Sequence, residues 1–103
     1  MRVALVQMTS VPDINLNIKF IKDFTKVAKN NGADLVLFPE NCGFMGRGDE
    51  MQSNAYEESF HPVLIASKEI ANKYNIFVLL GSIAVYPSKN NKTKLANRSL
   101  FID

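Results

Sequence analysis

The sequence is poor in cysteine and histidine: among its 103 residues, Cys42 and His61 are each the only one of their kind. A single cysteine cannot form a disulfide within the chain. One cysteine and one histidine cannot supply the four ligands of a structural zinc site. We therefore expect no disulfide framework and no metal. The glycines at 43, 46 and 48 do not have the spacing of a dinucleotide-binding motif or a P-loop, so we expect no cofactor either.

An excess of charge of either sign is also missing, since 12 basic and 10 acidic residues leave a formal net charge of +2. This balance argues against the broad basic surface of a nucleic-acid-binding protein. Long hydrophobic runs are absent as well. The N-terminal stretch MRVALVQMTS turns polar too soon for a secretion signal or a membrane-spanning helix. We expect a cytoplasmic protein that binds neither nucleic acid nor membrane.

The hydrophobic content of 47% is that of a globular protein, and the length allows one domain. The apolar run VALVQM at 3–8 predicts a first strand, and apolar residues at helical spacing predict a helix from about Asn15 to Asn31, which Gly32 ends. The run DLVLF at 34–38 predicts a second strand, parallel to the first. The chain therefore opens with a β-α-β unit.

The second half continues the same alternation. Apolar positions from Phe60 to Tyr74 predict a second helix with Pro62 in its first turn and His61 as its entry residue, and IFVLLG at 76–81 predicts a third strand. YPSKNNKTK at 86–94 predicts a turn, and LANRSLFID at 95–103 a fourth strand, antiparallel to the third. The strands read as buried on both faces, and the glycine-rich segment Asn41 to Asn54 as a loop.

The motif FPEN places Glu40 directly after Pro39, which ends the second strand because proline has no N–H for the sheet. Catalytic side chains gather at the carboxyl ends of strands in α/β sheets. Two interpretations of Glu40 follow, a catalytic carboxylate or a solvated strand end. Cys42, two residues along an extended chain, would lie about 6 to 7 Å farther on the same side, too far for an acid–thiol hydrogen bond. A nearby carboxylate would also raise the pKa of its thiol.

The segments ALVQM, GADLVLFPEN and NRSLFID resemble, in order and spacing, the nitrilase or carbon–nitrogen hydrolase superfamily over nearly the whole chain. PENCGFMGRGDE and QMTSVPD are most similar to the deaminated-glutathione amidase branch, in which an aromatic residue more often stands at the position of Cys42. The resemblance implies the N-terminal part of a four-layer αββα sandwich, with its elements in the order β-α-β-α-β-β.

The resemblance also implies a catalytic Glu, Lys and Cys and identifies the first as Glu40. The thiolate attacks an amide or nitrile carbon, the glutamate is the general base, and the lysine stabilises the oxyanion. The family lysine follows the fourth strand in a YDK stretch, and the nucleophile comes later. Neither Cys42 nor the lysines of the predicted turn match these positions: Lys89, Lys92 and Lys94.

Because the chain ends at Asp103, we expect residues 1–103 to form an incomplete carbon–nitrogen hydrolase domain that is inactive alone. Two other interpretations stay open. In the first, a separately encoded C-terminal chain supplies the lysine and cysteine and pairs with the fourth strand. In the second, the chain is a non-catalytic remnant or binding module. The expected partners are a small amide-type substrate after completion, and a complementing chain or a homo-oligomer.

Overall fold

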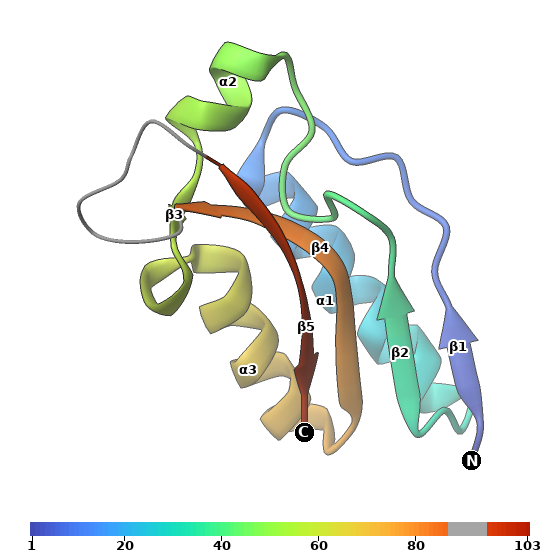
Figure 1. Ribbon diagram of the computed structural model, residues 1–103. Helices are drawn as coiled ribbons and strands as arrows, with labels where there is room; N and C mark the ends of the chain where they lie inside the picture. The colour runs from blue at the N-terminus through green and yellow to red at the C-terminus, as the bar shows by residue number, and fades with distance from the viewer. Residues whose placement is uncertain (87–94) are drawn as a thin grey trace.

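The computed structural model describes residues 1–86 and 95–103 and contains a mixed five-stranded sheet with helices packed on one face (Figure 1). Residues 87–94 of the predicted turn, with Lys89, Lys92 and Lys94, lie outside the described residues. The strand order is β1-β2-β4-β3, and β5 pairs with β4. This is the α/β class that the sequence predicts.

The predicted β-α-β opening is confirmed. Strand β1 (Val3–Leu5) and strand β2 (Leu35–Phe38) are parallel, and helix α1 (Ile14–Asn30) connects them. The carboxylate of Asp13 caps α1 by accepting a hydrogen bond from the Leu16 N–H at 3.1 Å. Gly32, at φ 81°, follows the helix in the left-handed conformation that glycine tolerates.

The second half follows the prediction in the order of its main elements, but the third predicted strand runs to Tyr86 and does not end at 81. Helix α3 (Pro62–Tyr74) leads to strand β4 (Phe77–Tyr86), which pairs in parallel with β2. Strand β5 (Ala96–Ile102) is antiparallel to β4, as predicted. Pro62 occupies the first turn of α3, where its missing N–H is harmless.

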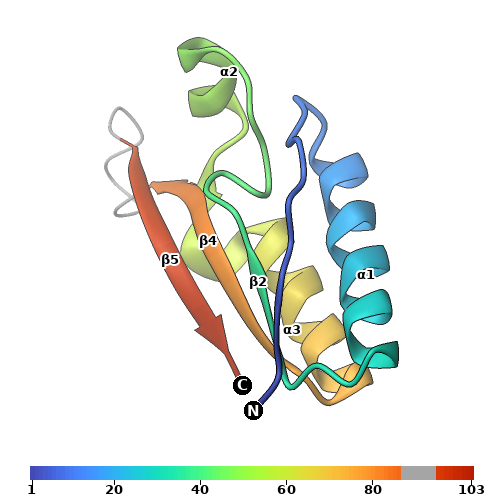
Figure 2. The same cartoon turned by 90° about the vertical axis from the view of Figure 1, so that its right-hand side faces the viewer.

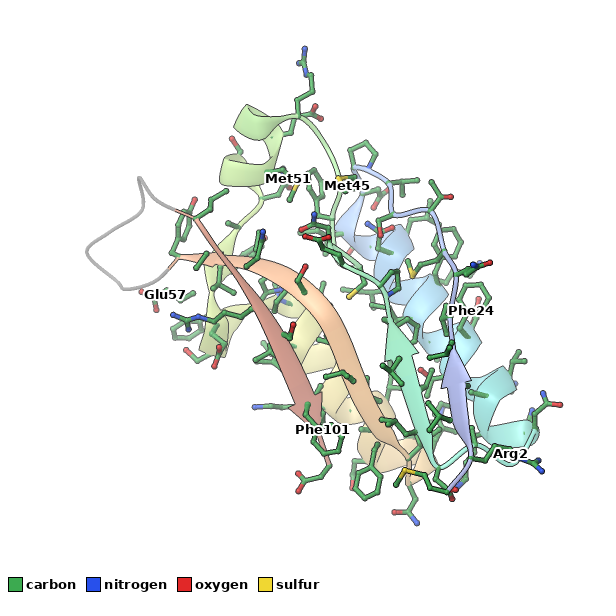
Figure 3. All side chains as sticks on the ribbon, turned by 45° about the vertical axis from the view of Figure 1, so that its right-hand side comes forward. Arg2, Phe24, Met45, Met51, Glu57 and Phe101 are labelled. Atoms are coloured by element: carbon green, nitrogen blue, oxygen red, sulfur yellow. The ribbon has the colours of Figure 1, made fainter. Side chains whose placement is uncertain are left out.

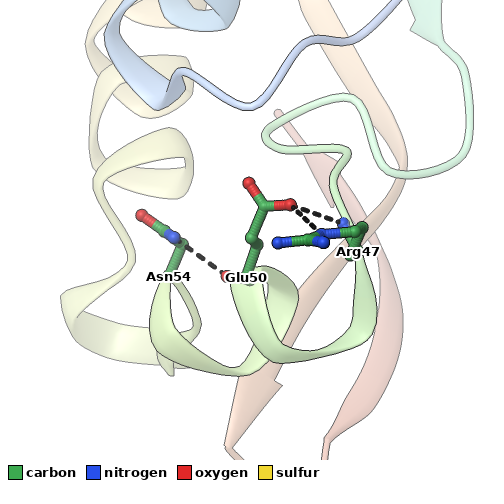
Figure 4. Close-up of polar contacts among 3 residues, drawn as sticks. All are labelled: Arg47, Glu50 and Asn54. Atoms are coloured by element: carbon green, nitrogen blue, oxygen red, sulfur yellow. Dashed lines mark hydrogen bonds and ion pairs between the residues drawn. The ribbon is translucent and has the colours of Figure 1, made fainter.

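The prediction of a loop from Asn41 to Asn54 is wrong in part, because helix α2 (Gly48–Ser53) lies within it. Strand β3 (Tyr56–Glu57) and the 3-10 helix η1 (Glu58–Phe60) were not predicted either. Helix α2 has no apolar periodicity and is stabilised by polar contacts of its own residues. Glu50 Oε1 accepts hydrogen bonds from the backbone N–H and the side-chain Nε of Arg47, both at 3.2 Å, and Asn54 Nδ2 donates to the Glu50 carbonyl at 2.9 Å (Figure 4).

Helices α1 and α3 lie side by side against the same face of the sheet (Figure 2). Alternate residues of β2 and β4 point into the layer between sheet and helices, because successive side chains of a strand point to opposite faces. The core of that layer includes Ile21, Val36, Val63, Val78 and Leu80, all at most 1% exposed.

The opposite face of the sheet is apolar but open, so the strands that the sequence predicts to be buried on both faces are covered on one face alone in this chain. The register aligns two rows across the strands, Val3–Leu35–Phe77 and Leu5–Leu37–Leu79–Phe101. The outermost side chains are the most exposed: Leu5 is 77% exposed and Phe101 59%. Phe101 lies near the end of β5, where its ring stacks on that of Phe77 at 5.6 Å between centroids (Figure 3).

Candidate functional site

Glu40 lies at the carboxyl end of β2, in the turn that follows Pro39. Its side chain is exposed, and its carboxylate forms no hydrogen bond or ion pair with the residues that the structure describes. The segments that follow β1 and β2 leave the sheet at this same end, where α2 also lies. A carboxylate without an intramolecular partner can accept a proton from a bound molecule, so Glu40 meets the first requirement of a general base.

The chain turns sharply at Asn41, which has φ 52°, a left-handed value that is rare for residues other than glycine. The backbone N–H of Asn41 donates to Ser82 Oγ at 2.8 Å. The prediction of an extended chain between Glu40 and Cys42 is therefore wrong. The turn sends the two side chains into different surroundings, because Glu40 faces solvent and Cys42 is fully buried.

Cys42 is held in the interior against β4. Its backbone N–H and its Sγ both donate to the Ser82 carbonyl, at 3.3 and 3.6 Å. Burial is the main cause that raises the pKa of the Cys42 thiol to about 11, so the neutral thiol predominates near neutral pH. The cause we expected from the sequence was the neighbouring carboxylate. A buried thiol with a raised pKa packs as a small apolar side chain and is a poor nucleophile.

Asn17 of α1 holds the loop from the other side, a role that the sequence analysis did not assign. Its side chain is completely buried and donates from Nδ2 to the Val11 carbonyl at 2.7 Å and the Gly43 carbonyl at 2.9 Å. The Val11 N–H donates back to Asn17 Oδ1 at 3.1 Å. The available sequence signal was an amide four residues before Ile21, on the apolar side of the helix.

The sequence analysis also missed Gly81 and Ser82 of β4. A side chain on Gly81 would collide with the backbone of Phe38 and Pro39, so glycine is what lets β2 end this close to β4. Ser82 is 5% exposed and contacts the two residues after Glu40. The loop that carries Glu40 is thus bound by α1 on one side and by β4 on the other.

His61 was predicted only as a helix-entry residue, and the structure confirms that place. Its Nδ1 caps α3 by accepting from the Val63 N–H at 3.2 Å, and its ring meets that of Tyr56 edge-on at 5.5 Å. Burial lowers the pKa of His61 to about 4, against the opposing effect of a hydrogen bond with the Ala84 backbone. Its contacts are structural, and we assign it no chemistry.

Two features are absent from the described residues. Within 1–86 and 95–103, no cluster of three or more His, Cys, Asp or Glu side chains is arranged to hold a metal ion. Nor does that part of the chain contain a helix both long and apolar enough to cross a membrane.

Comparison with known proteins gives a consistent result. The family model described as carbon-nitrogen hydrolase matches residues 2–103. The amidase of Nesterenkonia sp. AN1, from the nitrilase superfamily, superposes with a TM-score of 0.84 at 26% identity, over 100% of this chain and 38% of that one. The C. elegans NitFhit protein matches with a TM-score of 0.76 at 24% identity, over 98% of this chain and 24% of that one.

Other structures of the Nesterenkonia amidase contain small amide compounds. One is a complex with acrylamide, and another shows covalent addition of the acetamide moiety of fluoroacetamide at that enzyme's active-site cysteine. The present chain spans 38% of the length of that amidase.

Proposed function

Because the chain belongs to the carbon-nitrogen hydrolase family, we propose that it is the part of an amidase that supplies the general base, and that the base is Glu40. The observation that carries the proposal is the position of Glu40, exposed and unpaired among the described residues at the carboxyl end of β2. A solvated strand end would look the same in isolation. The family match is what favours catalysis.

The proposed reaction is hydrolysis of a non-peptide C–N bond through a cysteine thioester. Glu40 takes the proton of the incoming thiol, and the thiolate attacks the amide carbon while a lysine stabilises the oxyanion. Glu40 returns that proton to the amide nitrogen as the C–N bond breaks, so ammonia leaves and a thioester remains. Glu40, again a carboxylate, then activates the water that hydrolyses the thioester. Cys42 is not this nucleophile, because its thiol is buried and donates to the Ser82 carbonyl.

The proposed substrate is a small amide. The small amide compounds in the Nesterenkonia amidase support this class. Within it, the stretches PENCGFMGRGDE and QMTSVPD favour the deaminated-glutathione amidase branch and substrates of the α-ketoglutaramate type.

We further propose that the catalytic lysine and cysteine come from the remaining part of the family fold, and that this part covers the open face of the sheet. The apolar rows on that face support the proposal, since large exposed apolar patches mark sites of association. A separate chain that supplies both residues is the split-enzyme form of the same proposal. A non-catalytic binding module is the alternative.

The test is complementation with the C-terminal segment of the Nesterenkonia amidase, followed by ammonia release from simple amides. The chain alone should show no turnover, and the complemented assembly should be active. Glu40→Gln keeps the size of the side chain but removes the base, so kcat should fall by about 10² to 10⁴. The matched control is Glu69→Gln, which neutralises an exposed carboxylate on α3.

Cys42→Ala should change the rate of the assembly less than about threefold, because this thiol takes no part in the proposed reaction. An assembly that forms normally and is active, yet tolerates Glu40→Gln as well as Glu69→Gln, would refute the assignment. An assembly that forms but never turns over would favour the binding-module alternative.

A further inference from the structure

We propose that Ser82 is a positioning residue for Glu40, an inference that rests on the proposed function. Ser82 lies on β4, far from Glu40 in the sequence, yet it binds both residues that follow the carboxylate. Its Oγ accepts from the Asn41 N–H at 2.8 Å, and its carbonyl accepts from the Cys42 N–H at 3.3 Å. One buried residue of the rigid sheet therefore holds the turn that carries the base.

The Ser82 hydroxyl contacts Asn41 at the point where the backbone turns into the left-handed conformation. Asn41 adopts φ 52°, a left-handed value that asparagine tolerates better than most residues other than glycine. Asparagine often stabilises such a turn through its own side chain. Here the Asn41 Oδ1 is buried and has no hydrogen-bond partner among the described residues. The left-handed turn is therefore held by Ser82, through the hydrogen bond from the Asn41 N–H to its Oγ and the one from the Cys42 N–H to its carbonyl.

The backbone of β4 is shaped to make this contact. The pairing of β4 with β2 ends at Phe38 and Leu80, so the Ser82 carbonyl lies beyond the last β2 pair and binds Cys42 instead. The register between β4 and β5 also shifts between Leu80 and Ile83. At the neighbouring position, Gly81 leaves room for the Pro39 backbone to approach. Strand β4 therefore places the Ser82 hydroxyl and the Ser82 carbonyl directly beside the turn that follows Glu40.

The consequence for catalysis is geometric. Glu40 stands between Pro39, whose ring fixes its own φ, and Asn41, whose φ depends on Ser82. The backbone on both sides of Glu40 is then restrained, which limits the directions its carboxylate can take. A general base must lie within hydrogen-bond reach of the proton it abstracts, and a displacement of about 1 Å can lower a rate about 100-fold.

The first arm of the test needs no activity. Amide order parameters of Glu40, Asn41 and Cys42 are measured by ¹⁵N relaxation in the chain, diluted until size-exclusion chromatography shows a monomer. Ser82→Ala removes the Oγ acceptor, and the order parameters of these amides should drop from about 0.85 towards 0.6. Ser82→Thr retains a hydroxyl and should restore them. Ser67→Ala is the matched control, since Ser67 is 1% exposed and its hydroxyl has no partner among the described residues.

The second arm measures kinetics in the complemented assembly. Ser82→Ala should lower kcat about 10- to 100-fold while KM changes less than about threefold, and Ser82→Thr should recover most of the loss. In a Glu40→Gln background the same substitution should lower kcat less than about twofold further, because the group it positions is already gone. Ser67→Ala should leave kcat unchanged.

The outcomes separate the two hypotheses. Order parameters that stay at the wild-type value in Ser82→Ala overturn the inference, with or without activity. A loosened turn with unchanged kcat also overturns it, and so does a full additive loss in the Glu40→Gln background. An assembly that never turns over refutes the proposed function but not the role of Ser82. The order parameters still show whether Ser82 fixes the residues around Glu40.

Discussion

Cys42 and His61 are both buried, and burial moves the pKa values of their side chains in opposite directions. The pKa of the Cys42 thiol rises to about 11 and that of the His61 imidazole falls to about 4. Both shifts have the same cause, because a low-dielectric interior disfavours the charged form, which is the thiolate for cysteine and the imidazolium for histidine. Each residue is therefore kept neutral, and each packs as part of the core.

The consequence for His61 is a loss of stability in acid. Its pKa is about 4 in the folded chain and 6.5 for an unperturbed histidine, so between these values the unfolded chain binds more protons. The contribution of neutral His61 to the free energy of unfolding is fully present above about pH 6.5. It is lost as the pH falls towards 4, and the total loss is up to about 3 kcal/mol. Protonation would also place a hydrogen on Nδ1, which now accepts from Val63. Urea unfolding at several pH values measures the effect.

The control for this prediction is His61→Asn. Asparagine can still cap a helix but does not titrate, so the free energy of unfolding should lose most of its slope between pH 4 and pH 6.5. The variant should be less stable at pH 7, because it fills less of the buried space. An unchanged pH dependence in His61→Asn would show that other groups govern the acid response.

At the scale of elements, the close approach of β2 and β4 depends on Gly81. Added to that residue, a Cβ atom would meet the backbone of Phe38 and Pro39, which cannot move away as a flexible side chain can. Gly81→Ala should therefore lower the free energy of unfolding by about 1 to 3 kcal/mol, as overpacking does. Urea denaturation followed by circular dichroism gives this value.

Gly46→Ala is the control for Gly81→Ala. A Cβ at Gly46 would contact side-chain atoms of Phe44 and Glu50 at 3.0 and 3.2 Å, and these can shift. We expect it to cost less than about 1 kcal/mol. Equal losses in the two variants would mean that the approach of β2 to β4 at Gly81 is not a special requirement of the fold.

For the whole molecule, the open face of the sheet sets the behaviour of the chain in solution. Leu5 and Phe101 stand at opposite ends of an apolar row that crosses β1, β2, β4 and β5. Continuous exposed apolar surface of this kind promotes association. We expect the chain alone to self-associate and to bind a dye for apolar surface, as seen by size-exclusion chromatography and fluorescence.

Phe101→Lys should shift the chain towards monomer and reduce dye binding, because a charge at the end of the row opposes its burial. Phe60→Lys is the comparison, since Phe60 is 64% exposed, similar to the 59% of Phe101, but lies on η1 outside the sheet. A compact monomer of the unmodified chain that binds no dye would contradict the prediction. Equal effects of Phe101→Lys and Phe60→Lys would show that the chain does not associate through the open face of the sheet.

The sequence by itself determined the elements whose signals are local. Apolar spacing and Gly32 located α1 to within one residue at each end, and Pro39 placed Glu40 at the carboxyl end of β2. The positions of α3 and β5 and the antiparallel pairing of β5 with β4 were predicted as well, although β4 runs to Tyr86, beyond its predicted end at 81. These features depend on neighbouring residues, so a single sequence contains them. Helix α2 was missed because its six residues have no apolar periodicity.

The tertiary structure alone decided what surrounds Glu40. Asn17 reaches Gly43 across 26 residues of sequence, and Ser82 reaches Asn41 across 41, and no local pattern predicts such contacts. Those contacts turned Cys42 inward and left Glu40 in solvent. The apolar runs showed that the strands can be buried on both faces. Only the arrangement of helices around the sheet determines which face this chain covers.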